Sequence, residues 1–117
     1  MAENCIFCRI VAGELPASMV YEDETVVAFK DIRPQAPVHV LVVPREHVDS
    51  IAHLDDSHAE MAGKTILAVE KVARAVGGLE EGYRVIINCG EAGGQTVPHL
   101  HLHLLGGRRF SEGMVRD

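Results

Sequence analysis

The positions of apolar and polar residues along the 117-residue chain predict five β-strands and two helices. Residues 18–23 and 25–32 are rich in strand-forming residues, and the acidic residues between them indicate a hairpin turn. Residues 38–44 are apolar at nearly every position, so this segment is expected to be buried on both faces at the centre of the sheet. The five predicted strands are residues 18–23, 25–32, 38–44, 83–90 and 98–106.

Two other segments have the pattern of a helix. Residues 4–13 predict a short helix that is capped by Asn4 and ends at a glycine. Ser57 followed by Glu60 is a capping-box pattern, and beyond it an apolar stripe repeats at steps of four and three residues. Two adjacent glycines at 77–78 would end this long helix. The stripe consists of Ala62, Ile66, Val69, Ala73 and Val76.

The order of these elements predicts an α+β fold. Strands joined by short turns, with one long helix between the third and fourth, indicate an antiparallel sheet that the helix covers on one face. The length, with 47% hydrophobic residues, suits a single domain over residues 1–117. No apolar run is long enough to span a membrane, and residues 1–16 lack the basic start and apolar segment of a signal peptide. We therefore expect a cytoplasmic protein.

The formal charge of −6 argues against two classes of partner. Duplex nucleic acid and anionic membranes select basic surfaces, whereas this chain has no basic run beyond the short segment GRRF. Three Phe, two Tyr and no Trp also leave few rings for stacking on successive bases. We expect no nucleic-acid or membrane partner, and a single small ligand instead.

Three histidines alternate along the last predicted strand. His99, His101 and His103 would share one face of that strand, and the leucines between them would face the core. A polar strand face is one interpretation, and a metal site is a second, although no histidine follows His103 to complete such a site. Covalent catalysis is the third, because imidazole is a competent nucleophile toward phosphorus and a neighbouring imidazole can donate to phosphoryl oxygens.

The glycine-rich segment before these histidines favours the third interpretation. GEAGGQTV contains Gly93 and Gly94, whose amides can approach a phosphate closely, and Gln95 and Thr96 add side-chain donors. Most glycine-rich loops are only turns, so the position directly before the histidines is the informative feature. His101 is then the natural nucleophile, because it has a histidine on either side.

The segment HLHLHLL matches the His-φ-His-φ-His-φ-φ signature of the histidine triad (HIT) family. Three longer segments also resemble this family: CIFCRIVAGELPA, YEDETVVAFKDIRPQAPVHVLVVPREH and YRVIINCGEAGGQTVPHLHLHLLGGR. The chain most resembles the histidine triad nucleotide-binding branch. That resemblance implies a homodimer in which each chain has a five-stranded antiparallel sheet and two helices. It also implies hydrolysis of purine nucleoside phosphoramidates such as adenylyl-lysine.

The resemblance also implies a role for each histidine. His101 would form a nucleotidyl-histidine intermediate, which water then hydrolyses. His103 would contact a non-bridging phosphate oxygen, and the carbonyl of His99 would orient the ring of His101. Thr96 stands where close relatives have Ser, so its hydroxyl would still contact the leaving group.

The resemblance further implies a binding site for a purine nucleotide of the AMP or GMP type. Asp31 would accept both ribose hydroxyls, although the residue alone fits a turn-capping Asp equally well. Asn88 and Gln95 resemble phosphate-side contacts. For the apolar residues, a place in the core is by default the commoner role. The remaining implied nucleotide-binding residues are Ile6, Phe7, Ile10, Phe29, Ile32, Leu41, Gly94 and Val97.

The pair Cys5-x-x-Cys8 raises the question of a metal. Three cysteines, an odd number, make a disulfide framework unfavourable, and two thiolates need two further ligands to bind a structural zinc ion. Bacterial members of the family and the related galactose phosphate uridylyltransferases use a similar set, which implies Zn²⁺ ligands at Cys5, Cys8, His47 and His99. The alternative is a reduced pair packed within the first helix. His39, His53 and His58 are treated as non-ligands, with His39 near the pocket.

Three functions stay open at this point. A nucleoside phosphoramidase is favoured. A dinucleoside polyphosphate hydrolase of the sister branch fits less well, because the loop GGQTVPH resembles the first branch better. The third is a non-catalytic nucleotide sensor or a zinc-dependent interaction module, against which the intact triad argues. The tail RRFSEGMVRD lacks the Trp-Pro-Pro-Gly ending common in the nucleotide-binding branch, which leaves the leaving-group preference open.

Overall fold

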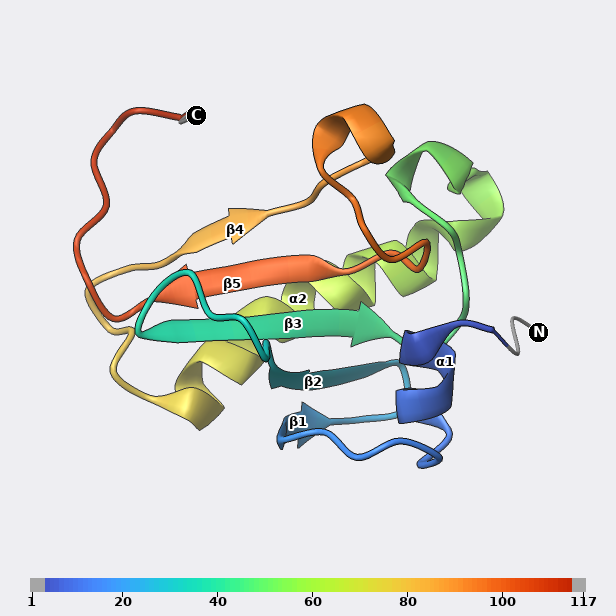
Figure 1. Ribbon diagram of the computed structural model, residues 1–117, viewed down its shortest axis with the longest axis horizontal. Coiled ribbons are helices and arrows are strands. Elements are labelled where there is room, and N and C mark those ends of the chain that lie inside the picture. The colour runs from blue at the N-terminus through green and yellow to red at the C-terminus, as the bar shows by residue number, and fades with distance from the viewer. Residues whose placement is uncertain (1–3, 115–117) are drawn as a thin grey trace.

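A computed structural model describes residues 4–114 and contains one five-stranded sheet with a long helix behind it (Figure 1). The strand order is β1-β2-β3-β5-β4, and every neighbouring pair is antiparallel. The elements are α1 (Ile6–Val11), β1 (Met19–Glu22), β2 (Val26–Lys30), β3 (Val38–Pro44), α2 (Ala59–Val76), β4 (Arg84–Ile86) and β5 (Leu102–Gly106), with short 3-10 helices at η1 (Ile51–His53), η2 (Asp56–His58) and η3 (Glu91–Gly93). The α+β fold and the hairpin of the first two strands are confirmed.

Strand β3 lies at the centre of the sheet, as its apolar sequence predicts. It pairs with β2 on one side and with β5 on the other, and Leu41 is the register partner of both Phe29 and His103. Strands β3 and β4 run in the same direction because α2 carries the chain across the sheet between them. This register places Phe29, Leu41 and His103 side by side on the face of the sheet opposite α2.

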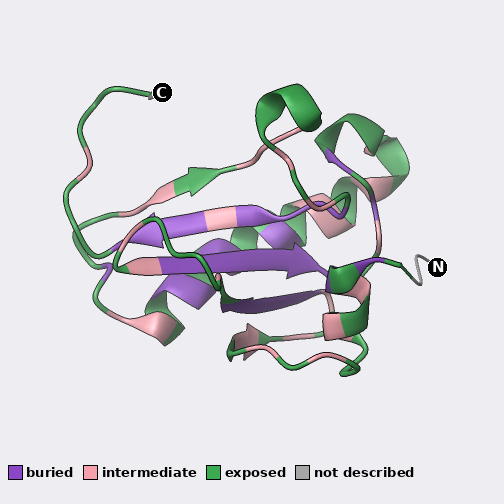
Figure 2. Ribbon diagram, in the orientation of Figure 1, coloured by how far each residue is buried: buried purple, intermediate pink, exposed green. Residues whose placement is uncertain are grey.

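The period-two alternation of the central strands separates two clusters of buried side chains. Figure 2 shows β2, β3 and most of β5 as buried. The cluster against α2 contains Val26, Ala28, Val40, Val42, Ala68, Val69, Val72, Ala73, Leu79, Leu102 and Leu104. The cluster on the other face contains Cys5, Phe7, Val27, Phe29, Leu41 and Val43. Burial of each Val or Leu side chain contributes about 1.5–3 kcal/mol to the stability of the fold, so the larger cluster holds α2 firmly against the sheet. Helix α1 covers only part of the second face.

The fifth strand begins later than predicted. It starts at Leu102, so His99 lies in a bend before the strand and His101 in the irregular residues that lead into it. Pro98 has no amide hydrogen to donate to a neighbouring strand, and the amide of His99 donates to Val97 at 2.8 Å, which turns the chain instead of extending it. The fourth strand is likewise shorter than residues 83–90, because it comprises only Arg84–Ile86 at the sheet edge.

Both predicted helix starts are displaced. Cys5, rather than Asn4, caps α1, since its Sγ accepts a hydrogen bond from the amide of Cys8 at 3.3 Å. The capping box is formed by Asp55 and His58 at η2 rather than by Ser57 and Glu60, because the Asp55 carboxylate accepts the Ser57 amide at 2.8 Å. A carboxylate with two acceptor oxygens outcompetes the nearby hydroxyl for these amides.

The buried stripe of α2 is also shifted from the predicted one. Val69 and Ala73 are buried as expected, but Ile66 is 54% exposed. Thr65 and Val72 are buried instead, and the Thr65 hydroxyl donates to the carbonyl of Met61 at 2.8 Å. Because the helix begins at Ala59 and is oriented by its contacts with β1–β3, its packed face is rotated by about one position.

Within residues 4–114, no helix has both the length and the apolar character needed to cross a membrane.

Candidate active site and metal cluster

His101 is held by the backbone just before β5. Its Nδ1 lies 2.7 Å from the carbonyl oxygen of His99, and a carbonyl only accepts, so Nδ1 carries the hydrogen. The neutral ring therefore has its lone pair on Nε2. The ring is buried, and the edge of Phe7 packs against it with centroids 5.0 Å apart. Burial lowers the pKa of His101, which keeps the imidazole uncharged and available as a nucleophile.

His103 lies beside His101 on the same side of the sheet. The two ring centroids are 5.1 Å apart. Burial, followed by the neighbouring His101 and His39, lowers the pKa of His103 to about 4. His103 is therefore neutral at physiological pH, and the only way it can bind a phosphate oxygen is as an N–H donor.

His39 lies between His103 and Asp31, near the pocket as the sequence predicts, but sequence reasoning gave it no chemical role. Its Nε2 is 2.9 Å from Nδ1 of His103 and 3.4 Å from a carboxylate oxygen of Asp31. The signal in the sequence was a single polar residue within the most apolar strand, β3, where an unpartnered polar group would be costly. His53 bonds to Ser50 and His58 belongs to the Asp55 capping box, so both lie outside the two histidine clusters described here.

Asp31 follows β2 and is engaged on both sides. Its Oδ1 accepts the amide of Arg33 at 2.7 Å, which is the turn-capping role that the residue type allowed. Its Oδ2 faces His39, and its own amide donates to the His39 carbonyl at 3.0 Å. Asp31 can therefore cap the turn and lie beside the histidines at the same time.

The predicted base-slot residues divide into buried and exposed groups. Phe7, Phe29 and Leu41 lie in the buried cluster next to the histidines, and the Phe7 and Phe29 rings meet edge to face at 5.5 Å. Ile10 and Val97 pack against the rim of that cluster. Ile6 on α1 and Ile32 after β2 are exposed, Ile32 by 92%.

The loop before the histidines is tied down by Gln95. Its side-chain amide donates to the carbonyls of Asp49 at 2.7 Å and Val97 at 2.9 Å, and its oxygen accepts the amide of Gly90. Both amide hydrogens are therefore used inside the protein, so Gln95 orients the loop and has no hydrogen left for a phosphate.

The same loop brings two more predicted residues together. Gly94 has a positive φ of 90°, which favours glycine, and it lies against the half-buried Asn88. Thr96 is exposed on the loop, where its hydroxyl is accessible to a bound molecule.

A second cluster joins Cys5 and Cys8 to His47 and His99 at one end of the sheet. The Nδ1 atoms of the two histidines are 3.1 Å apart, Cys5 Sγ is 3.3 Å from Nδ1 of His99, and Cys8 Sγ is 3.2 Å from Nδ1 of His47. These separations are close to the edges of a tetrahedron with bonds of about 2.0–2.3 Å. Neither cysteine forms a disulfide.

The second nitrogen of each clustered histidine supports a metal-binding role. Nε2 of His99 lies 2.8 Å from the carbonyl of Pro44, and Nε2 of His47 lies 2.6 Å from the carboxylate of Asp49. Both partners accept, so each ring carries its hydrogen on Nε2 and presents the Nδ1 lone pair to the cluster. The four residues fit a structural zinc ion in donor type, spacing and tautomer.

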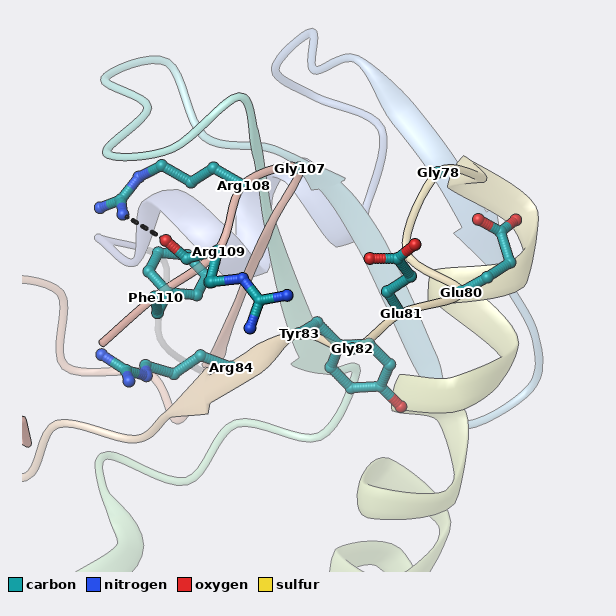
Figure 3. A pocket seen from close by; sticks show the side chains of 10 residues that line it. All are labelled: Gly78, Glu80, Glu81, Gly82, Tyr83, Arg84, Gly107, Arg108, Arg109 and Phe110. Atoms are coloured by element: carbon teal, nitrogen blue, oxygen red, sulfur yellow. Dashed lines mark hydrogen bonds between the residues drawn. The ribbon is translucent and has the colours of Figure 1, made fainter. Parts of the chain in front are cut away.

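A cavity of about 560 Å³ lies elsewhere, beyond the end of β5 (Figure 3). Arg84 and Arg108 lie on one side with Phe110, whose ring centroid is 4.9 and 4.4 Å from their guanidinium carbons. Glu80 and Glu81 lie on the other side. None of its lining residues belongs to either histidine cluster, so this cavity is separate from both clusters.

Comparison with known proteins places this arrangement in a family. The HIT domain family model matches residues 12–110. The chain is 44% identical over 108 residues to a purine nucleoside phosphoramidase of Escherichia coli strain K12, covering 92% of this chain and 91% of that protein. It is 47% identical over 108 residues to a 14 kDa zinc-binding protein of Zea mays, covering 91% and 84%.

Solved structures agree with the sequence comparison. A HIT family hydrolase from Clostridium thermocellum superposes with a TM-score of 0.94 at 49% identity, covering 98% of this chain and 100% of that one. The histidine arrangement, the five-stranded sheet and these matches lead to one conclusion: the chain belongs to the histidine triad family.

Proposed function

We propose that this protein is a nucleotide-binding hydrolase that cleaves purine nucleoside 5′-phosphoramidates to a nucleoside monophosphate and an amine. The observation that carries the proposal is the neutral, buried ring of His101, whose Nδ1–H is held by the His99 carbonyl so that Nε2 has a free lone pair. The similarity to the phosphoramidase of E. coli supports the same substrate class.

In the proposed mechanism, Nε2 of His101 attacks the α-phosphorus. A nitrogen–phosphorus bond to His101 forms as the bond to the amine breaks. Water then attacks the nucleotidyl-histidine, so that overall water supplies the hydroxyl on phosphorus and the proton on the amine. His103 donates to a non-bridging oxygen, Thr96 contacts the leaving group, and Asp31 accepts the ribose hydroxyls.

The experiment that tests this function compares two substrate classes. Purified protein is given adenosine 5′-phosphoramidate or diadenosine polyphosphates, and AMP release is measured. We expect the phosphoramidate to have the higher kcat/KM, because the loop GGQTVPH resembles the phosphoramidase branch. Preference for the polyphosphates would move the protein to the sister activity, and turnover of neither would favour a nucleotide sensor.

We also propose that Cys5, Cys8, His47 and His99 hold a structural Zn²⁺ ion. The geometry of these residues and the similarity to the maize zinc-binding protein support this assignment. The ion would cross-link α1 to the segments before β5 and after β3, and would stabilise the fold without taking part in the chemistry. The three cysteines form no disulfide with one another, which suits a reducing compartment, and we propose the cytoplasm.

A homodimer is the third part of the proposal. Strand β4 is at the sheet edge and exposes Val85 and Ile86, and α2 exposes Ile66 and Leu67. Unpaired edges and exposed apolar side chains favour association with another chain. We expect light scattering to give twice the mass of one chain, and Val85→Lys to shift the protein toward the monomer. A wild-type mass of one chain would contradict the dimer.

A further inference from the structure

The hydrogen bonds around His39 determine which of its ring nitrogens carries the hydrogen. The backbone amide of Gln35 donates to Nδ1 of His39 at 3.0 Å. An amide N–H can only donate, so Nδ1 must accept, and a neutral His39 carries its hydrogen on Nε2. His39 is 6% exposed, and burial lowers its pKa against the opposing influence of Asp31, in keeping with a neutral ring.

The loop that supplies this amide is fixed at several points. Asp31 binds the amide of Arg33 through its side chain and the carbonyl of His39 through its own amide. The side chain of Gln35 donates to the carbonyl of Arg33 at 3.2 Å. These bonds hold residues 31–39 as one unit, so the Gln35 amide is a preset donor toward His39.

The hydrogen on His39 then determines the state of His103. Nε2 of His39 is nearer to Nδ1 of His103, at 2.9 Å, than to the Asp31 carboxylate, at 3.4 Å. Nδ1 of His103 accepts this hydrogen, which leaves the hydrogen of a neutral His103 on its own Nε2. Without this bond the two tautomers of His103 would compete, and one of them offers only a lone pair at Nε2 to a phosphate oxygen.

We propose that His39 is a positioning residue that, through the Gln35 amide, sets the tautomer of His103 so that its Nε2–H donates to the nucleotide phosphate. This inference rests on the proposed function for the identity of the phosphate ligand. The tautomers of His39 and His103 do not depend on any substrate. His101 and His103 are thus set in opposite tautomers, one with a lone pair on Nε2 for attack and the other with a hydrogen on Nε2 for binding.

A metal is the competing explanation for Asp31, His39 and His103, whose ligand atoms also lie close together. The ring nitrogen of each histidine that would not bind the metal distinguishes metal binding from hydrogen bonding. A neutral imidazole ligand keeps a hydrogen on the nitrogen that does not bind the metal, as His47 and His99 do toward Asp49 and Pro44. In His39 that nitrogen already accepts an N–H, so metal binding through Nε2 would require a deprotonated imidazolate. Hydrogen bonding is therefore the favoured arrangement.

Long-range ¹H–¹⁵N spectra of the ¹⁵N-labelled protein test the tautomers directly at neutral pH. We expect hydrogen on Nε2 of His39 and His103 and on Nδ1 of His101, with His103→Gln used to assign the His103 signals. Hydrogen on Nδ1 of His103 would overturn the proposal, whether or not any substrate is hydrolysed. Failure of phosphoramidate turnover with the expected tautomers would instead count against the proposed function alone.

Two variants of matched size separate a donor from a space-filling role. His39→Gln keeps an N–H donor toward His103, and we expect kcat to fall by less than about tenfold. His39→Glu replaces the donor with an acceptor, and we expect a loss of about 10² or more in kcat with a smaller change in KM, as when one anion-binding donor is removed. Equal losses in folded forms of the two variants would overturn the donor role.

Zinc content is the control for the metal explanation. Wild type and His39→Gln should hold the same amount of zinc, because the proposal assigns none to His39. A second equivalent of zinc that is lost in His39→Gln would overturn the proposal in favour of a metal site. If His39→Glu fails to fold, the tautomer spectra of the wild type and the activity of His39→Gln still decide the outcome.

Discussion

Replacing His101 with alanine is expected to reduce phosphoramidate turnover by at least about 10³-fold, because loss of a nucleophile removes the covalent route and leaves only substrate binding. The ring is packed against Phe7 and fixed through the His99 carbonyl, and no other imidazole of the triad has its Nε2 lone pair prepared in this way. KM should change much less than kcat, because the chemistry is removed while the ribose and base contacts stay. AMP release in the steady state and in a single turnover measures both quantities.

The matched control is His53→Ala. His53 is exposed on η1 and bonds to Ser50, outside the two histidine clusters, so turnover should stay near that of wild type. Denaturing mass spectrometry during turnover should also detect nucleotide covalently bound to wild-type protein and none on His101→Ala. Retention of full rate by His101→Ala in a folded protein would refute nucleophilic catalysis by this residue.

Loss of zinc is expected to lower the melting temperature by about 12–24 °C. Structural zinc sites in small peptides bind Zn²⁺ with a free energy of about 10–16 kcal/mol. A free Zn²⁺ concentration of about 1,000 times the dissociation constant stabilises the folded state by about 4 kcal/mol. For a chain of this size, 1 kcal/mol corresponds to roughly 3–6 °C. Calorimetry of wild type with and without a chelator, and of Cys8→Ser, measures this shift alongside zinc content.

Cys89→Ser is the control for Cys8→Ser. Cys89 is half-buried near Ser50 and outside the four-residue cluster, so zinc content and melting temperature should be nearly unchanged. Turnover should also fall when zinc is lost, since the ring of His99 belongs to the cluster while its carbonyl orients His101. A zinc-free preparation that melts at the same temperature as the loaded protein would remove the structural role.

The local pattern of the sequence was most informative in the central strands. Alternation along β2, β3 and β5 predicts which residues share a face, because successive side chains of a strand point to opposite sides whatever the rest of the fold does. Val40 and Val42 accordingly face α2, while His39 and Leu41 face the other way. The same alternation predicts that His101 and His103 lie side by side.

Helix ends were less predictable because several side chains compete for the same amides. Asn4, Cys5, Asp55 and Ser57 all have acceptors near a helix start, and small differences in loop geometry select the one that bonds. The start of β5 shows the same limit, since the turn at Pro98 depends on how residues 97–99 bond to each other and not on the apolar pattern.

The sequence by itself determined the fold class, the shared face of the histidines and the ligand types, because periodicity and side-chain chemistry are local properties. The tertiary structure alone decided which groups meet. His99 joins Cys5 across 94 residues of sequence and His39 joins His103 across 64, and in each ring the partner of the second nitrogen sets the position of the hydrogen. A tautomer depends on what faces both ring nitrogens, and only the assembled sheet and its loops bring those groups together.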